Sequence, residues 1–485
     1  MDKKVLLISV PAPAVTQTQT EVDYWNWHYA LKSKLTYPNL SKEQLLYFGN
    51  TENQNIGLLS IASALRENNI AVEYLAPSVD LMGDKRDWEF LDKVLAKVES
   101  FEPDFVGLSS PTCSIPTAIH YAQLIKSVRP KSTTVIGGAH ANGCEGKLLD
   151  ELADDFDYII RGKGESPFVN LVLNSSNMMG ICYKDNGIMY ESPICMAGIP
   201  NYPRPANDLL NIKYLPAARV FTSLGCGGKC IFCVDINTKN FSEITEDSII
   251  AEIKYFYHNL GTRYFYLGDE NFFFNKNRAF RLLERINSLE LDIILGFQAR
   301  VESTDENIIK NIARFHNCTE IQYGVESASQ TILNTAKKGL RIEKVREICE
   351  LTKRYGINTQ CYFLAGLPGE TRQTAELTIG MIEDLLEEGI IDMAEYRCVI
   401  PFPGSEMWNN KEKYGIKIKN TNWTQYRGEN HPPYDLSTLF SEEIYEYYLE
   451  GLRKITDIYA KRYMRDFGEQ KLDINVLSAI TEGGF

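Results

Sequence analysis

The first 200 residues alternate between short apolar runs and amphipathic segments. The run from Val5 to Val10 predicts a buried strand, and apolar residues at positions 58, 61, 62 and 65 fall on one face of a helix. Further strand-like runs follow at 105–110, 133–140 and 158–168. Strands that alternate with helices, with glycine-rich turns at the strand ends, predict an open, parallel, doubly wound α/β sheet. Ligands of such sheets bind outside the carboxyl ends of the strands.

A second pattern of strands and helices follows, and it repeats about six times. The predicted strands lie near 217–223, 262–270, 292–300, 319–327, 357–366 and 393–402, with amphipathic helices between them. Six such units are too few for a closed eight-stranded barrel, so they predict a partial (β/α)₆ barrel. Polar candidates stand at the carboxyl ends of these strands, where barrels of this type carry their chemistry.

These patterns divide the chain into four regions. We expect a Rossmann-like domain at 1–198, a proline-rich linker at 199–214, the partial barrel at 215–405 and a mostly helical region at 406–485 that covers the barrel mouth. The polar and aromatic segment at 11–54 gives no clear structural signal. Substrate identity would depend on that segment and on the C-terminal region, and the sequence does not reveal it.

Composition narrows the class of protein. The 485 residues are 44% hydrophobic and 24% charged, with a net charge of −13 and no basic stripe, which argues against a nucleic-acid partner. No run of 18 apolar residues predicts a membrane span, and the N-terminal run reads as a strand rather than a signal peptide. The 11 cysteines show no disulfide framework and suit a reducing cytoplasm.

Three of these cysteines form the most informative motif. Cys226, Cys230 and Cys233 have a CxxxCxxC spacing, so their thiolates can hold three irons of a [4Fe–4S] cluster and leave the fourth iron open. A zinc knuckle is the alternative, but it would need a second ligand pair, and no pair lies nearby. The other cysteines indicate no second cluster. We therefore expect an iron–sulfur site with one open coordination position.

The cysteine loop resembles the signature of the radical SAM superfamily, including the aromatic Phe232 before the third cysteine. The resemblance implies that S-adenosylmethionine (SAM) chelates the fourth iron and that a cluster electron cleaves it to a 5′-deoxyadenosyl radical. Motifs at the later strand ends are similar to those that contact SAM in the family, although each alone could be a helix cap or a turn. They are Asp269 and Glu270 for the amino group, Arg300 for the carboxylate, Glu326 and Ser327 for the ribose, and Gly366, Glu370 and Ile400 near the adenine.

The N-terminal domain resembles the cobalamin-binding domain that precedes many radical SAM domains. The resemblance rests on the NIGLLSIASAL helix and on the turns VGLSSPT, VIGGAH and RGKGE. It implies cobalamin contacts by Ser109, Ser110, Thr112, Gly137, Gly138, Gly164 and Glu165. The chain lacks a DxHxxG motif, so it offers no histidine as an axial ligand, and its turn reads GKGE where GEGE is usual. The alternative is a sheet of the same type that has lost cobalamin.

Together these features predict a radical SAM enzyme. We expect hydrogen abstraction from a substrate carbon, followed by cobalamin-mediated methyl transfer. The alternatives are a cobalamin-independent dehydratase, epimerase or cyclase, and a non-catalytic iron–sulfur or cobalamin-binding sensor. Tyr396 and Cys398, on the sixth strand, are candidate hydrogen donors if either points into the barrel, although a strand cysteine is more often a core residue. The expected partners are a small-molecule or natural-product substrate and an electron donor such as flavodoxin or ferredoxin.

Overall fold

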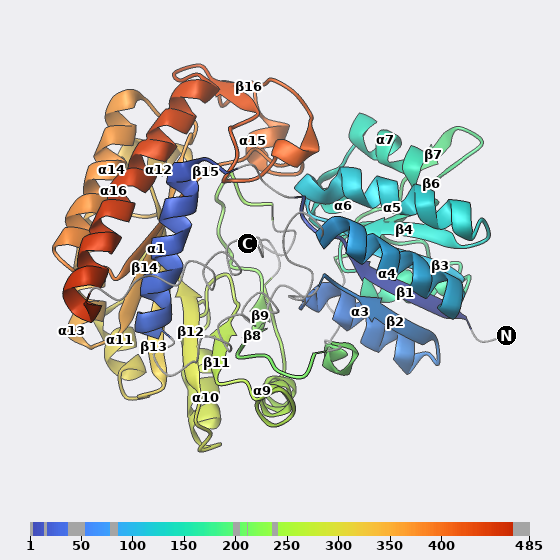
Figure 1. Cartoon of the computed structure of the whole chain (residues 1–485), viewed down its shortest axis with the longest axis horizontal. Coiled ribbons are helices and arrows are strands. Elements are labelled where there is room, and N and C mark those ends of the chain that lie inside the picture. The colour runs from blue at the N-terminus through green and yellow to red at the C-terminus, as the bar shows by residue number, and fades with distance from the viewer. Residues whose placement is uncertain are drawn as a thin grey trace.

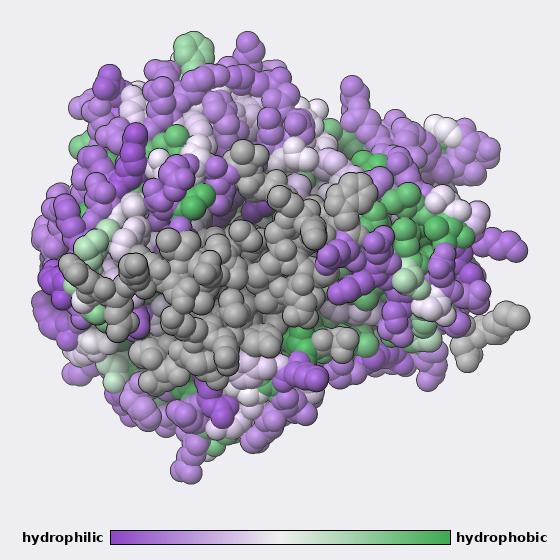
Figure 2. All heavy atoms as spheres, viewed as in Figure 1, coloured by the Kyte–Doolittle hydropathy of each residue, from purple (hydrophilic) through white to green (hydrophobic). Residues whose placement is uncertain are grey.

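The computed structural model describes residues 3–13, 17–36, 54–77, 86–196, 204–210, 212–234 and 241–468. It forms two lobes, each built around one sheet (Figure 1). The described outer surface is largely hydrophilic on the face in Figure 2, in keeping with the charged composition. Among the described helices, none has the length and apolarity that crossing a membrane requires. Parts of the segment 11–54, of the linker and of the C-terminal region lie outside the described residues.

The N-terminal lobe holds a seven-stranded sheet with the order β2-β1-β3-β4-β5-β6-β7. Its first five strands are parallel, as predicted, and buried aliphatic side chains fill both faces. The strands are β1 (Lys4–Ser9), β2 (Ala71–Leu75), β3 (Phe105–Ser109), β4 (Thr133–Gly137), β5 (Tyr158–Ile160), β6 (Ile181–Asp185) and β7 (Ile188–Tyr190). The helices are α3 (Ile56–Glu67), α4 (Arg86–Phe101), α5 (Ile115–Val128), α6 (Ala139–Gly143), α7 (Lys147–Asp155) and α8 (Glu165–Val172).

The last two strands of this sheet differ from the predicted parallel arrangement. β6 pairs antiparallel with both β5 and β7. The turn between β6 and β7 holds Asn186 and Gly187, whose φ angles are 49° and 78°. Positive φ at both central residues is typical of the two-residue turn that Asn-Gly favours in hairpins. The edge of the sheet is therefore a local hairpin rather than another strand–helix unit.

The second lobe is the predicted partial barrel. Its six strands are all parallel and follow one another in the order β15-β14-β13-β12-β11-β8. The strands are β8 (Ala217–Val220), β11 (Tyr264–Leu267), β12 (Ile294–Ala299), β13 (Cys318–Glu326), β14 (Asn358–Ala365) and β15 (Met393–Cys398). The helices are α9 (Glu246–Leu260), α10 (Lys276–Asn287), α11 (Glu306–Ile312), α12 (Gln330–Thr335), α13 (Glu343–Arg354) and α14 (Arg372–Glu387).

The region after the barrel is less uniformly helical than predicted. It contains α15 (Glu406–Asn409), an antiparallel pair of β16 (Ile416–Ile418) with β17 (Tyr434–Leu436), and the long helix α16 (Ser441–Phe467). A short 3₁₀ turn at Trp423–Gln425 belongs to this region, and another, at Thr112–Ser114, lies in the N-terminal lobe. A second antiparallel pair, β9 (Ser223–Leu224) with β10 (Ser242–Glu243), flanks the cysteine loop.

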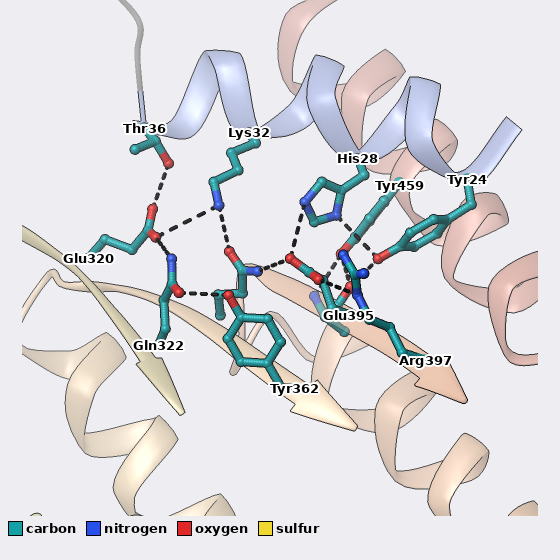
Figure 3. A network of polar contacts seen from close by, with 12 residues as sticks. Tyr24, His28, Lys32, Thr36, Glu320, Gln322, Tyr362, Glu395, Arg397 and Tyr459 are labelled. Carbon is teal, nitrogen blue, oxygen red and sulfur yellow. Dashed lines mark hydrogen bonds and ion pairs between the residues drawn. The ribbon is translucent and has the colours of Figure 1, made fainter. Parts of the chain in front are cut away.

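Helix α1 (Gln19–Thr36) follows β1 in the chain but lies in the other lobe. In Figure 1 it is the dark blue helix among the orange and red elements of the barrel. Figure 3 shows α1 crossing the strands: the Thr36 hydroxyl donates to Glu320 at 2.8 Å and the Lys32 ammonium donates to Gln360 at 2.9 Å. The segment at 19–36 thus packs on the barrel, although the sequence pattern assigned it to the N-terminal domain.

The contacts of α1 with β15 are buried and charge-balanced. Arg397 lies 3.1 Å from Glu395 and also pairs with Glu429, and its guanidinium lies 5.1 Å from the centre of the Trp25 ring. Burial alone would raise the pKa of Glu395, but the basic groups around it, Arg397 first among them, together outweigh burial and the pKa is lowered. Burial lowers the pKa of His28 to about 3, so this imidazole is neutral at physiological pH. A polar, compensated interface therefore fixes α1 against the inner side of β15.

Candidate active site

The cysteine loop follows β9 and surrounds one end of a cavity inside the barrel. Cys226, Cys230 and Cys233 are half-buried and line this cavity, whose volume is about 190 Å³. The Gly228 N–H donates a hydrogen bond to the Cys226 sulfur at 3.3 Å. Among the described residues, no three Cys, His, Asp or Glu side chains converge on a point where they could hold a single metal ion. The three thiols fit a cluster, in which each thiolate takes a separate iron.

Positive charge lies beside these sulfurs. The Arg300 guanidinium is 3.5 Å from the Cys230 sulfur, and it also binds Glu302 and the carbonyl oxygen of Lys338. The Lys338 ammonium is buried and lies 2.6 Å from Glu326. Burial alone would lower the pKa of Lys338, but the Glu326 carboxylate and the Cys230 sulfur together outweigh burial and the pKa is raised. Two cations, Arg300 and Lys338, and two carboxylates, Glu270 and Glu326, therefore border the cavity, a set that can bind a zwitterionic amino-acid group.

The floor of the cavity is a fixed hydrogen-bond array. The hydroxyl of Tyr362 donates to the side-chain oxygen of Gln322 at 2.6 Å, and the Gln322 amide donates to Glu320 (Figure 3). The hydroxyl of Tyr266 donates to the same Gln322 oxygen, also at 2.6 Å. The amide can satisfy Glu320 only with its nitrogen, so its oxygen must face the two tyrosines. Gln322 and Tyr362 line the cavity, and helix α1 holds Glu320 from behind.

The structure brings several of the predicted SAM residues together at this cavity and leaves others out. Phe232, Glu270, Arg300 and Glu326 line it with the three cysteines. Lys338, Gln298, Gln322 and Tyr362 line it as well, and the sequence patterns did not identify them. Strand alternation could have indicated Gln322, because it lies an even number of residues before Glu326 on the same strand. The predicted residues that do not line it are Asp269, Ser327, Gly366, Glu370 and Ile400.

The Asp269 carboxylate bonds to neighbouring protein groups and does not line the cavity. Its carboxylate is fully buried and accepts bonds from the backbone N–H and the hydroxyl of both Thr222 and Ser223. Arg278 lies 3.8 Å from it on the other side. These bonds tie the end of β8 to the end of β11 and use the lone pairs of the carboxylate. The prediction that Asp269 contacts the SAM amino group is therefore replaced by a role in shaping the cysteine loop.

Ser327, Gly366 and Glu370 also form hydrogen bonds to neighbouring residues of the chain. The Ser327 hydroxyl bonds to Ser329 and lies 3.3 Å from the Thr378 hydroxyl. Glu370 accepts the Gly366 N–H at 2.5 Å and so closes the turn after β14. Burial raises the pKa of Glu370 to about 8, and the Gly366 N–H only partly opposes that shift. The other carboxyl oxygen of Glu370 is buried with no hydrogen-bond partner, which suits a protonated acid.

This buried acid gives a testable pH dependence. Its folded pKa of about 8 lies above the unfolded value of about 4.3, so folding holds a proton that the unfolded chain releases. The contribution of Glu370 to the free energy of unfolding is therefore fully present below about pH 4 and is lost as the pH rises towards about 8. The side chain of Glu370→Gln stays neutral, so we expect the free energy of unfolding of this variant to fall less over this pH range than that of the parent protein. The two slopes should differ by up to about 1.4 kcal/mol per pH unit. Urea unfolding midpoints at several pH values measure this.

The matched control is Glu376→Gln, which removes an exposed carboxylate from α14 of the same lobe. It should follow the pH profile of the parent protein. Parallel profiles for the parent and Glu370→Gln would contradict a buried, protonated Glu370.

Tyr396 and Cys398, the candidate hydrogen donors, face away from the cavity, so the condition for that role is not met. Tyr396 packs against Gly451 and Tyr448 of α16, and both side chains are buried. Side chains alternate along a strand, and Glu395 and Arg397 take the side that α1 covers. Neither Tyr396 nor Cys398 lines the cysteine cavity, so the structure gives no support to a hydrogen-donor role.

A second, larger cavity lies between the two lobes. Its volume is about 660 Å³, and it is lined from the N-terminal side by loops at the carboxyl ends of β3, β4 and β5. The barrel contributes Phe221, Leu224, Val234 and Phe402. Of the predicted cobalamin residues, Ser109, Gly137, Gly138, Gly164 and Glu165 line it, whereas Ser110 and Thr112 do not. Thr112 instead lies 3.3 Å from the His140 ring, and both are buried.

Two observations bear on whether this cavity fits a large polar cofactor. Glu165 accepts the Ser60 hydroxyl at 2.7 Å with one oxygen, and its other oxygen is buried without a partner. Such an oxygen suits an amide or hydroxyl donor from a ligand. Gly138 has a φ of 101°, and a Cβ there would lie 2.9 Å from the backbone of Ser110, so the loop keeps a close backbone cradle. No histidine is among the described lining residues.

The two cavities adjoin. Phe232, Cys233 and Glu270 line both of them. The third cysteine of the motif is therefore exposed to the small cavity and to the cavity between the lobes. A group bound at the cysteine loop and a group bound between the lobes would be neighbours across this shared wall.

Comparisons with known proteins match this arrangement. The family model of the B12 binding domain matches residues 50–172, and that of the radical SAM superfamily matches residues 220–382. The chain is 28% identical to an uncharacterised methyltransferase of Pyrococcus horikoshii, over 76% of this chain and 81% of that protein. It is 27% identical to the anaerobic magnesium-protoporphyrin IX monomethyl ester cyclase of Rubrivivax gelatinosus, over 69% of this chain but only 62% of that protein.

The fold is also similar to that of a solved structure. The structure of the radical S-adenosylmethionine methyltransferase TsrM from Kitasatospora setae, with cobalamin and a [4Fe–4S] cluster bound, superposes with a TM-score of 0.61 at 16% identity. The match covers 86% of this chain and 77% of that chain. At this identity the likeness shows the fold alone.

Proposed function

We propose that this chain, a radical SAM enzyme that carries a B12-binding domain ahead of its radical SAM domain, methylates an unactivated carbon of a small molecule. One observation carries the proposal: the cysteine cavity and the cavity between the lobes share the wall formed by Phe232, Cys233 and Glu270. Methyl transfer from a corrinoid to a carbon radical requires these two cofactors to meet the same substrate atom, because proximity supplies much of the rate.

The residues have distinct tasks in this proposal. Cys226, Cys230 and Cys233 would hold the cluster, while Arg300 and Lys338, which line the same cavity, would bind the carboxylate of SAM. When bound, the cluster and SAM supply a 5′-deoxyadenosyl radical, and cobalamin supplies the methyl group. The protein positions these groups and excludes water through the apolar lining of the cavity between the lobes.

The alternative is radical chemistry without methyl transfer. This alternative is supported by one relative, because the similar protein of Rubrivivax gelatinosus is named as a cyclase. A cyclase, epimerase or dehydratase would form 5′-deoxyadenosine without S-adenosylhomocysteine. The methyl-transfer reaction forms both, because a second SAM renews the methyl group.

Partners and location belong to the same proposal. A flavodoxin or ferredoxin would deliver the cluster electron, and a small molecule, such as a natural-product intermediate, would be the substrate. Nucleic acid is a poor partner for a chain with a net charge of −13. None of the eleven cysteines forms a disulfide, which suits a reducing cytoplasm.

Corrinoid retention tests the proposal. The protein is purified without oxygen from cells supplied with cobalamin, and the corrinoid is quantified after cyanide extraction. We expect about one corrinoid per chain, and S-adenosylhomocysteine together with 5′-deoxyadenosine once a substrate is found. A protein that holds its cluster and cleaves SAM but retains no corrinoid would contradict methyl transfer and favour the alternative.

A further inference from the structure

The two lobes touch at a pair of glycines. Gly143 ends α6 in the N-terminal lobe, and Gly404 lies in the turn after β15. A Cβ on Gly143 would overlap the carbonyl oxygen of Pro403 and lie 2.5 Å from its carbon. A Cβ on Gly404 would lie 2.6 Å from the Cα of Gly143. The two backbones are therefore in direct contact, and neither position has room for a Cβ.

On the N-terminal side, this contact is joined directly to the loops of the cavity between the lobes. Gly138, Ala139 and Asn142, from the same short segment as Gly143, line that cavity. The Asn142 side chain accepts the Gly162 N–H at 2.7 Å, which ties the segment to the turn after β5. Gly143 cannot move without moving the walls of this cavity.

On the barrel side, the contact is joined to the cysteine loop. Phe402, next to Pro403, lines the cavity between the lobes. The Met407 N–H, three residues after Gly404, donates to the carbonyl oxygen of Ile231 at 3.0 Å. Ile231 lies between Cys230 and Cys233. One short path of backbone contacts thus runs from the cavity loops through the glycine pair to the cysteines.

We propose that Gly143 and Gly404 form a spacer that sets the distance between the corrinoid and the iron–sulfur cluster. This inference rests on the proposed function, because the spacing matters only if both cofactors are bound. The carbonyl carbon at 2.5 Å must retreat by about 1 Å to reach the ordinary contact of about 3.5 Å, and the nearer carbonyl oxygen requires at least as large a shift. A displacement of about 1 Å can cost about 100-fold in the rate of a reaction between positioned groups. Both glycines are positioning residues and contact no reacting atom.

The test is the variant Gly143→Ala in the full-length protein with both cofactors. Gly143 is helical and has no positive φ, so alanine brings its volume without backbone strain. With cobalamin as Co(II) and the cluster reduced, both centres are paramagnetic, and electron paramagnetic resonance reports their dipolar coupling. We expect the coupling to fall, in keeping with a distance about 1 Å longer. Iron content, corrinoid content and 5′-deoxyadenosine formation without substrate should match the parent protein.

The matched control is Gly146→Ala, three residues further along the same loop. Gly146 has a φ of 53° but no atom within 4 Å of an added Cβ, so its substitution strains the backbone without touching the barrel. It should leave the coupling unchanged. Equal coupling in the parent protein and Gly143→Ala, with both cofactors bound, would overturn the proposed spacer role and leave the proposed function standing. A parent protein that retains no corrinoid would overturn the proposed function and the spacer with it.

Discussion

Replacing Cys230 by alanine is expected to remove the cluster and all reductive cleavage of SAM. Cys230 is the central cysteine of the loop, and its sulfur lies 3.5 Å from the Arg300 guanidinium. With two thiolates left, the loop can hold only two of the three irons that need a protein ligand. Iron and sulfide analysis after anaerobic reconstitution, together with 5′-deoxyadenosine formation under a chemical reductant, measures the loss.

The control for this variant is Cys318→Ala. Cys318 is buried at the start of β13, at the end of the strand opposite the cavity, and it lines neither cavity. It should keep its iron and its activity and lose only some core packing. SAM cleavage that survives Cys230→Ala at the parent rate would refute the cluster assignment and, with it, the radical mechanism.

Local patterns were enough to predict the parallel strands of both sheets. Short apolar runs and helices with period 3.6 are properties of neighbouring residues, so these strands could be located before any contact was known. The hairpin of β6 and β7 also had a local signal, Asn186-Gly187, which an interpretation based on parallel units passed over. The cysteine spacing likewise lies within eight residues.

The parts that could not be predicted depend on contacts between distant residues. Thr36 bonds to Glu320 across 284 positions, so nothing in the α1 segment alone indicates that it belongs to the barrel. Asp269 and Glu270 are adjacent carboxylates after β11, and only the tertiary structure shows that Glu270 lines the cavities while Asp269 is buried under Thr222. A sequence motif identifies the turn, but the path of the chain after the strand decides which side chain faces the ligand.

Lys337 and Lys338 illustrate the same limit. They are neighbours of one type, yet Lys338 is buried against Glu326 and Lys337 is exposed against Glu406. Both ion pairs have the same 2.6 Å separation. The difference arises because the turn after α12 directs one ammonium into the barrel and the other to the surface. This contrast makes the two lysines a matched pair for experiment.

Replacing Lys338 by methionine is expected to destabilise the barrel and to weaken SAM binding. Methionine fills the same space but leaves the Glu326 carboxylate buried without its partner, which costs about 3–5 kcal/mol. Losing one charge-assisted bond to the SAM carboxylate should raise the dissociation constant about 10- to 100-fold. Chemical denaturation and anaerobic equilibrium dialysis with SAM measure the two effects. Lys337→Met removes an exposed pair, so it should cost about 1 kcal/mol or less and leave SAM binding unchanged.

A double variant separates the structural loss from the loss of binding. Lys338→Met combined with Glu326→Gln removes both charges, so no unpaired carboxylate stays in the barrel, and much of the stability should return. SAM binding should stay weak, because the cation is still missing. If the double variant recovered SAM binding together with stability, Lys338 would only support the fold and would not bind the ligand. If Lys338→Met were as stable as Lys337→Met, the Lys338–Glu326 pair would not be buried as the structure describes it.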